Sequence, residues 1–308
     1  MSSSQGQNKE IRFERILIAT DFSEASRNAL RYAAAIARHH GARLYIVHVI
    51  SSVGYKMVGP DAEVAAADVA ARDLKELWGQ LGGVDESHGV ELALMVRRGE
   101  VCSELEELIH NELIDLVVVG TRGRTGVSKV MLGSVAEEIF RKVSCPVLTV
   151  GPNSARDWPQ REVGAEKVIL FATDFGDAAL KALLFAVSIA DRSRSKLILL
   201  HVDTPLLSTG PTPIFGQSLE RAEEEIRTAS HQRLAELIPK NPHVESEVRV
   251  KHGLPVDAIL GEASSSAAGL IVLGLRRKSL LVSSGHLLST TVYGVVVAAE
   301  CPVLTIRT

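Results

Sequence analysis

The stretch LVVVGTRGRTGVSKVMLGSV, residues 116–135, joins an apolar run to a glycine-rich loop and then to a predicted helix. Residues 116–119 are apolar and mostly β-branched, which is typical of a parallel strand covered on both faces. Gly120, Gly123 and Gly126 follow, and glycine lets backbone amides approach an anion closely. We predict Ser134 as the N-cap of a helix over residues 135–142, with its hydroxyl and the first free amides facing the same point. The stretch indicates a phosphate-binding loop.

The loop has the spacing Gly-x2-Gly-x9-Gly-Ser, which runs from Gly120 through Gly123 to Gly133 and Ser134. This is neither the P-loop pattern GxxxxGK[ST] nor the dinucleotide pattern GxGxxG, and no lysine follows the last glycine. Strand-to-helix loops also collect glycine and serine without binding any ligand. That structural interpretation stays open beside the phosphate-binding one.

Composition bounds the class of protein. The chain has 308 residues, 46% of them hydrophobic and 23% charged, which predicts a globular protein of two domains. A net charge of −3 offers no basic surface for nucleic acid, and no run of about 18 apolar residues predicts a membrane span. The three cysteines are widely spaced, which excludes a disulfide framework and a CxxC pair. We expect a cytoplasmic protein with no nucleic-acid or membrane partner.

An internal repeat organises the chain. Residues 15–22, RILIATDF, recur as VILFATDF at residues 168–175, and Leu-x3-His-Val recurs at the same displacement of 153 positions. A closing Cys-Pro-Val-Leu-Thr recurs at a displacement of 156, and the drift places small insertions in loops. We predict a disordered tail over residues 1–12, domains over residues 13–151 and 165–308, and a linker over residues 152–164.

Each half alternates predicted strands with predicted helices. Such alternation implies right-handed crossovers and parallel sheets. The fold class expected is α/β, with two tandem open parallel five-stranded sheets and helices on both faces. Ser23 is expected to cap the first helix, Gly41 to end it, and Pro255 to begin a later helix.

Asp21 follows the first strand, and ligands of such sheets lie beyond the carboxyl ends of the strands. If the first and fourth strands are neighbours, Asp21 and the glycine loop line one crevice. The carboxylate then accepts hydrogen bonds from a ribose or an adenine amino group, or holds a metal on a phosphate. Helix capping is the alternative role for Asp21. His48 and His201 end the second strand of each half, where packing at the sheet edge is the simpler interpretation. The absence of HxxxH, HExxH and Cys/His clusters predicts no intrinsic metal site.

Taken together, the strand with Thr-Asp-Phe, the strand ending in His-Val, the glycine loop and the closing Cys-Pro-Val strand resemble a universal stress protein domain. The resemblance spans both halves, so the chain resembles a tandem universal stress protein whose first domain falls in the ATP-binding subgroup. It implies ATP as ligand, with magnesium as an optional counter-ion of the phosphates. The implied contacts in the first half are Ala19, Thr20, Asp21, Val49, Gly120, Arg122, Gly123, Gly133, Ser134 and Val135.

The second half departs from this pattern. The position of Gly123 is held by Arg277, so a Cβ enters where backbone should meet phosphate. We expect weak or absent ATP binding at a degenerate second site. Its residues are Thr173, Asp174, Val202, Gly274, Ser289 and Thr290, while a different gap would instead use Gly285 and His286.

The expected function is ATP-dependent regulation or sensing in a stress response. No residue is placed by sequence to activate a nucleophile, so no catalytic residue is assigned. Slow ATP hydrolysis and autophosphorylation stay open, as do two alternatives: an adenylyl transferase or other nucleotide-consuming enzyme on the same fold, and a ligand-free interaction module. The apolar closing strands at residues 146–150 and 302–306 favour an intramolecular pseudo-dimer of the two domains. A homodimer stays open.

Overall fold

The computed structural model describes residues 11–51, 60–81, 90–121, 132–151, 154, 168–204, 216–276 and 291–307. The elements of the first half are β1 (Arg15–Ala19), α1 (Glu24–His40), β2 (Arg43–Ser51), α2 (Pro60–Gln80), β3 (Leu92–Gly99), α3 (Val101–Asn111), β4 (Leu116–Gly120), α4 (Ser134–Lys142) and β5 (Val147–Val150). Its parallel strands take the order β3-β2-β1-β4-β5, with the reversal between β1 and β4.

The second half repeats this plan. Its elements are β6 (Val168–Thr173), α5 (Asp177–Ser193), β7 (Lys196–Asp203), α6 (Gly216–Glu236), β8 (Ser246–His252), α7 (Pro255–Ser265), β9 (Ala268–Leu275), α8 (Thr291–Ala298) and β10 (Val303–Arg307). The strand order is β10-β9-β6-β7-β8, which is the first-half order reversed. The predicted α/β class with two five-stranded parallel sheets is confirmed.

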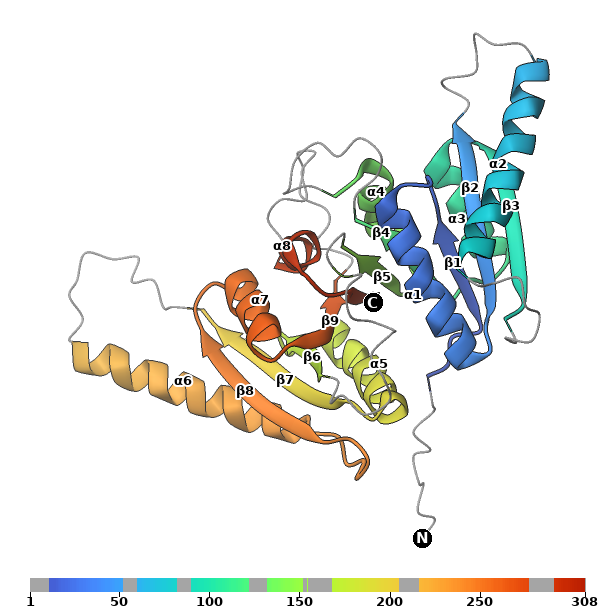
Figure 1. Ribbon diagram of the computed structural model, residues 1–308. Coiled ribbons are helices and arrows are strands. Elements are labelled where there is room, and N and C mark those ends of the chain that lie inside the picture. The colour runs from blue at the N-terminus through green and yellow to red at the C-terminus, as the bar shows by residue number, and fades with distance from the viewer. Residues whose placement is uncertain are drawn as a thin grey trace.

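The two sheets join into one ten-stranded sheet, with the halves side by side (Figure 1). Strand β5 pairs with β10 antiparallel, with Leu148 opposite Leu304, as expected for an intramolecular pseudo-dimer. Thr149 Oγ1 donates to the carbonyl of Val303 at 3.1 Å, and Thr305 Oγ1 donates to the carbonyl of Val147 at 3.2 Å. These reciprocal contacts are those of a pseudo-twofold interface. Because this one pair is antiparallel, the carboxyl ends of the parallel strands face opposite edges of the sheet in the two halves.

Helices cover both faces of the sheet, and each face carries one continuous apolar core. Buried residues of α1, α2, α5 and α6 form one core with alternate strand residues such as Ile16 and Phe171. Those of α3, α4, α7 and α8 form the other, together with the intervening strand residues such as Leu17 and Leu170. The continuous apolar strands read from the sequence therefore place side chains in both cores. No helix in the described part of the chain is both long and apolar enough to cross a bilayer.

The helix ends agree with the sequence at three predicted positions and differ at one. Ser23 caps α1 by accepting from the amide of Ser26, Gly41 ends it at a left-handed φ of 63°, and Pro255 lies in the first turn of α7. The prediction that Ser134 is the N-cap of α4 is wrong. Gly133 is the N-cap and Ser134 is already helical, because the chain turns into the helix one residue earlier.

Ile11 and Arg12, predicted within the N-terminal tail, bridge the two halves. The carbonyl of Ile11 accepts from Ser188 Oγ on α5 at 3.2 Å, and Arg12 Nε donates to the carbonyl of His40 at the end of α1 at 3.0 Å. These contacts tie the start of the described chain to one helix of each half.

Candidate functional site

The candidate site lies where β1 and β4 end side by side. Ile16, Leu17 and Ile18 of β1 pair in parallel with Leu116, Val117 and Val118 of β4, so the two strands are neighbours as the site prediction required. Their carboxyl ends lead directly into the turn of Asp21 and the glycine loop. This is the reversal point of the strand order, the usual ligand position of open α/β sheets.

A tight turn holds Asp21 at the mouth of β1. Phe22 has a φ of +63°, which is costly for a residue with a Cβ, and two side chains brace it. Thr20 Oγ1 accepts from the amide of Phe22, and Asp21 Oδ1 accepts from the amide of Ser23, each at 3.0 Å. Ser23 is the N-cap of α1, so Asp21 braces the turn before the helix and does not cap the helix itself. Thr20 is 5% exposed, and its hydroxyl also lies 3.0 Å from Ser26 Oγ, which makes it part of the turn.

Gly120 is required by the close approach of α1. A Cβ at this position would lie 2.8 Å from the backbone of Ala25, closer than packed atoms tolerate. Gly120 is not among the residues of positive φ, so the freedom of φ expected from the sequence is not used here. The glycine places the end of β4 directly against the first turn of α1, four residues after Asp21.

The two ends of the glycine loop meet beside this turn. The amide of Gly133 donates to the carbonyl of Thr121 at 2.9 Å, and the amide of Thr121 donates to that of Val150 at 3.0 Å. Helix α4 starts here, and its N-cap, Gly133, has no side chain to bond the first amides of the helix. Ser134 is exposed and Val135 half-buried in this first turn. Arg122 and Gly123 lie outside the described residues.

His48 clamps the mouth of the crevice from β2, which the sequence did not reveal. Its Nδ1 donates to the carbonyl of Thr20 at 2.8 Å, and its ring packs against Phe22 at a centroid distance of 4.7 Å. His201 makes the same contact with the carbonyl of Thr173 at 2.7 Å. Thr and His are 28 positions apart in both halves. That shared spacing was the available signal for this contact.

Three of the remaining predicted residues line the strand ends without such contacts. Ala19 is the last residue of β1, and Val49 follows His48 in β2. Both are half-buried, and Val202 holds the position of Val49 in the second half. All three pack against the apolar core on the side of α3, α4, α7 and α8. The predicted second-site residues Ser289 and Thr290 lie outside the described residues.

The second half repeats the turn but fills its mouth differently. Phe175 has a φ of +59° and donates its amide to Thr173 Oγ1 at 2.8 Å, while Asp174 Oδ1 accepts from the amide of Gly176 at 2.9 Å. The other oxygen of Asp174 pairs with Arg276 Nη2 at 2.7 Å. Gly274 again meets a helix start, since a Cβ there would lie 2.3 Å from the backbone of Ala178.

A buried polar group replaces an apolar one beneath the second mouth. Asp203, 9% exposed, accepts from Ser230 Oγ at 2.7 Å and lies 3.3 Å from His201 Nε2. The matching position in the first half is Ile50, which is buried. The two halves therefore share the turn and differ in polarity at this strand end.

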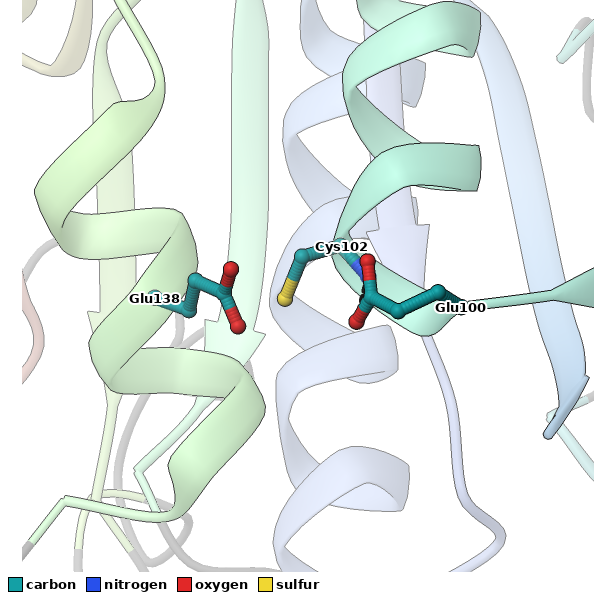
Figure 2. A group of neighbouring side chains, drawn as sticks. All are labelled: Glu100, Cys102 and Glu138. Atoms are coloured by element: carbon teal, nitrogen blue, oxygen red, sulfur yellow. Dashed lines mark hydrogen bonds between the residues drawn. The ribbon is translucent and has the colours of Figure 1, made fainter. Parts of the chain in front are cut away.

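One group of side chains within the described residues has the spacing of a metal site, namely Glu100, Cys102 and Glu138 (Figure 2). Each has a structural role. Glu100 accepts from the amides of Cys102 and Ser103 as the N-cap of α3, and Lys142 pairs with Glu138. Burial raises the pKa of the Cys102 thiol to about 12, which disfavours the thiolate that would bind a metal. This group gives no support for a metal site.

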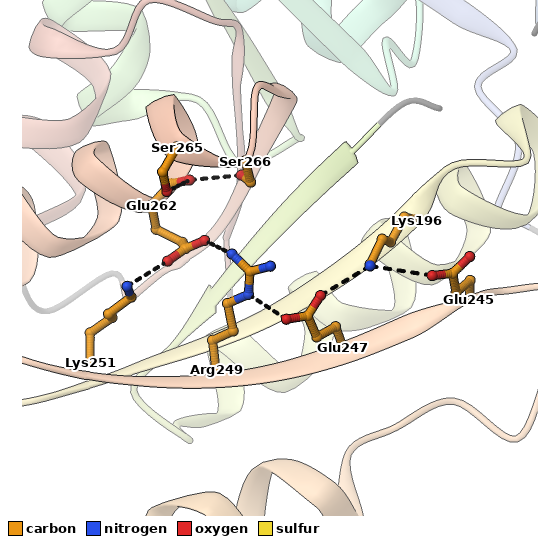
Figure 3. Close-up of polar contacts among 8 residues, drawn as sticks. All are labelled: Lys196, Glu245, Glu247, Arg249, Lys251, Glu262, Ser265 and Ser266. Carbon is orange, nitrogen blue, oxygen red and sulfur yellow. Dashed lines mark hydrogen bonds and ion pairs between the residues drawn. The ribbon is translucent and has the colours of Figure 1, made fainter. Parts of the chain in front are cut away.

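A charged network on the face of β8 distinguishes the second half further (Figure 3). Glu262 of α7 is fully buried and pairs with Arg249 and, at 3.1 Å, with Lys251. Arg249 also pairs with Glu247 at 2.7 Å, and the hydrogen bonds from Arg249 and Lys196 lower the pKa of Glu247 to about 2. Such networks perturb pKa values without forming a catalytic site.

The fold defines a tandem α/β protein, each half of which reverses its strand order between two neighbouring strands and has a Thr-Asp-Phe turn at the carboxyl end of its first strand. The sequence profile of the universal stress protein family matches residues 12–151 and 166–307. The chain therefore belongs to the universal stress protein family, as a tandem member.

Relatives agree with this assignment over both halves. A universal stress protein of Mycolicibacterium smegmatis is 28% identical over 299 residues, which cover 95% of this chain and 96% of that protein. A universal stress protein of Methanocaldococcus jannaschii is 31% identical over 147 residues, 47% of this chain and 85% of the relative. The crystal structure of a universal stress protein from Archaeoglobus fulgidus superimposes with a TM-score of 0.68 at 20% identity and covers 96% of this chain and 99% of its own, which supports the fold.

Proposed function

We propose that the first half binds ATP in the crevice between β1 and β4, and that the chain acts as a nucleotide-dependent regulatory protein of the stress response. The observation that carries the proposal is the juxtaposition of two features. The ends of the glycine loop close on each other at Thr121 and Gly133, beside a turn that presents Asp21 at the end of the neighbouring strand. A polyanion and a sugar need these two kinds of contact at one place.

The start of α4 fits a phosphate. Its N-cap is Gly133, so no side chain competes for the first amides, and the helix dipole adds partial positive charge. Ser134 is exposed in the first turn and offers a hydroxyl. Arg122 and Gly123 complete the proposed phosphate contacts, and magnesium serves as a counter-ion when the triphosphate is bound.

Asp21 is proposed to hold the nucleoside. One carboxylate oxygen braces the turn, and a carboxylate has lone pairs for further donors, such as ribose hydroxyls or the adenine amino group. Ala19, Thr20 and Val49 place backbone and apolar surface beside it, as the resemblance implies. The second half is proposed to bind ATP weakly or not at all.

Binding is favoured over catalysis. His48 at the mouth of the crevice acts as a clamp on the carbonyl of Thr20. A turnover assay tests the alternative of a slow ATPase or adenylyl transferase. Analysis of the purified protein for bound nucleotide tests the alternative of a ligand-free interaction module.

Cys102, Cys145 and Cys301 are free thiols, which supports a reducing compartment such as the cytoplasm.

The substitution Asp21→Asn tests the proposed site. The asparagine oxygen still accepts from the amide of Ser23, so the turn is retained, while the charge and half of the acceptor capacity are lost. Hydrogen bonds to charged groups contribute about 1.5–3 kcal/mol, so the Kd for ATP should rise roughly 10- to 100-fold. Isothermal titration calorimetry measures this change.

The matched control is Asp174→Asn, which makes the same change in the second turn. It should leave the main ATP-binding event unchanged. An unchanged Kd in Asp21→Asn, or a loss of binding in Asp174→Asn, counts against the assignment.

A further inference from the structure

Arg276 lies across the mouth of the second crevice. Its Nη2 is 2.7 Å from Asp174 Oδ2, and Asp174 Oδ1 is already bonded to the amide of Gly176. Both carboxylate oxygens therefore have partners from the protein. The residue that would meet a sugar in this half is engaged by a side chain from the end of β9.

The absence of a side chain at Gly176 leaves space for this guanidinium. A Cβ at Gly176 would lie 2.2 Å from Arg276 Nη2 and 2.8 Å from its Cζ. The first half has Ser23 at this position, where the hydroxyl caps α1 by accepting from Ser26. Helix α5 has no such side-chain cap. The second half thus lacks a capping side chain at a position where a Cβ would displace the arginine.

We propose that Arg276 competes with a nucleoside for Asp174 in the second half and so lowers the occupancy of this half. The Arg276–Asp174 pair seated on Gly176 is called the latch. The inference rests on the proposed function, because it assigns to Asp174 the same ligand class, a ribose with an adenine ring, as to Asp21. It makes Arg276 a residue that weakens the binding of that ligand in the second half.

The latch is weak enough to be displaced. The side chains of Arg276 and Asp174 are 58% and 63% exposed, and ion pairs this exposed add little stability and are screened by salt. The guanidinium also lies at the N-terminus of α5, where the helix dipole disfavours a cation. High salt should therefore weaken the Arg276–Asp174 pair. It should have little direct effect on the binding of a neutral ligand.

Adenosine is the appropriate probe because it has no phosphate that could itself pair with Arg276. We expect photo-crosslinking of the full chain with 8-azidoadenosine, followed by peptide mapping, to label the second half weakly in the wild type. In Arg276→Ala the label in peptides from residues 168–307 should rise about two- to fivefold, the range corresponding to an exposed ion pair. Raising the salt concentration should increase the wild-type label and leave that of the variant unchanged.

Two further variants separate the latch from a general effect on folding. Gly176→Ser restores the first-half residue, displaces the guanidinium and should raise the label as Arg276→Ala does. Arg233→Ala removes a different cation, which stacks on Phe175 at 4.0 Å from the ring centroid. This variant should leave the label in the second half unchanged. Label in the first half reports on the proposed function separately. If Arg276→Ala gains no label in the second half, or if the wild-type label ignores salt, the latch is overturned whatever the first half does.

Discussion

The two crevices are built on one turn and differ in what surrounds it. In both halves a Thr-Asp-Phe turn has a left-handed phenylalanine, braced by the threonine and aspartate and clamped by a histidine. In the first half the next residue caps its helix, whereas in the second half that residue is Gly176 and Arg276 covers the aspartate. The shared turn is therefore part of the fold, and only its surroundings distinguish a site proposed to be open from one proposed to be closed.

The outer strands show the same kind of difference. In the first half, Leu108 of α3 is buried in the apolar core against which Met95 of β3 packs. The matching positions in the second half hold Glu262 and Arg249, which pair with each other. A buried ion pair replaces an apolar contact at one place in the same architecture, which allows the two solutions to be compared within one chain.

The largest effect is expected from breaking the buried pair. Glu262→Ala removes a fully buried carboxylate, leaves a cavity, and takes one partner from each of Arg249 and Lys251, of which Arg249 keeps Glu247. Removing one partner of a buried pair costs about 3–5 kcal/mol, and the exposure of Arg249 and Lys251 places the expectation at the lower end, about 3 kcal/mol. Chemical denaturation followed by circular dichroism measures this loss.

The matched variant is Glu262→Leu, which copies the first half. It fills the volume and lets Arg249 and Lys251 turn to water, so it should cost about 1 kcal/mol or less. Equal losses in the alanine and leucine variants would show that the position is not governed by packing and pairing as described.

A smaller effect is expected at the paired glycines. Gly274→Ala places a Cβ 2.3 Å from the backbone of Ala178, and Gly120→Ala places one 2.8 Å from that of Ala25. Overpacking costs about 1–3 kcal/mol, and backbone atoms cannot move aside, so Gly274→Ala should lie near the upper value and Gly120→Ala near the lower. Differential scanning calorimetry should show the larger shift in melting temperature for Gly274→Ala, and the reverse order would contradict this packing.

The smallest effect is the pH dependence that Glu247 adds in the second half. The pKa of Glu247 is lowered to about 2 by Arg249 and Lys196, so its stabilising contribution is present above the unfolded pKa and is lost as the pH falls from about 5 towards 2. The first half has Ala93 at this position. In Glu247→Gln the unfolding free energy should fall less between pH 5 and pH 3 than in the wild type, by well under 1 kcal/mol for a pair this exposed. Identical acid profiles would show that Glu247 adds nothing.

Most of the fold followed from the sequence because the repeat and the apolar strands leave few topologies. The pairing of β5 with β10 was likewise expected from two short apolar strands at predicted sheet edges. Local geometry was less predictable. The position of Ser134 depended on where the loop turns into α4, and the role of Gly120 depended on how closely α1 approaches β4.

The latch shows why the second crevice was only partly predictable. Arg277 at the position of Gly123 was visible as a departure, but the contact of Arg276 with Asp174 joins residues 102 positions apart. The change from Ser23 to Gly176 in an otherwise repeated motif was the signal in the sequence, and its meaning depends on the side chain that lies over it.

Native mass spectrometry of the full chain titrated with ATP tests the central claim most directly, because it counts nucleotides per chain. If only the first half binds ATP well, the wild type and Asp174→Asn should each bind one ATP per chain. The fraction bound should be strongly reduced in Asp21→Asn. Two equivalents in the wild type, or one equivalent that survives Asp21→Asn and disappears in Asp174→Asn, would contradict it.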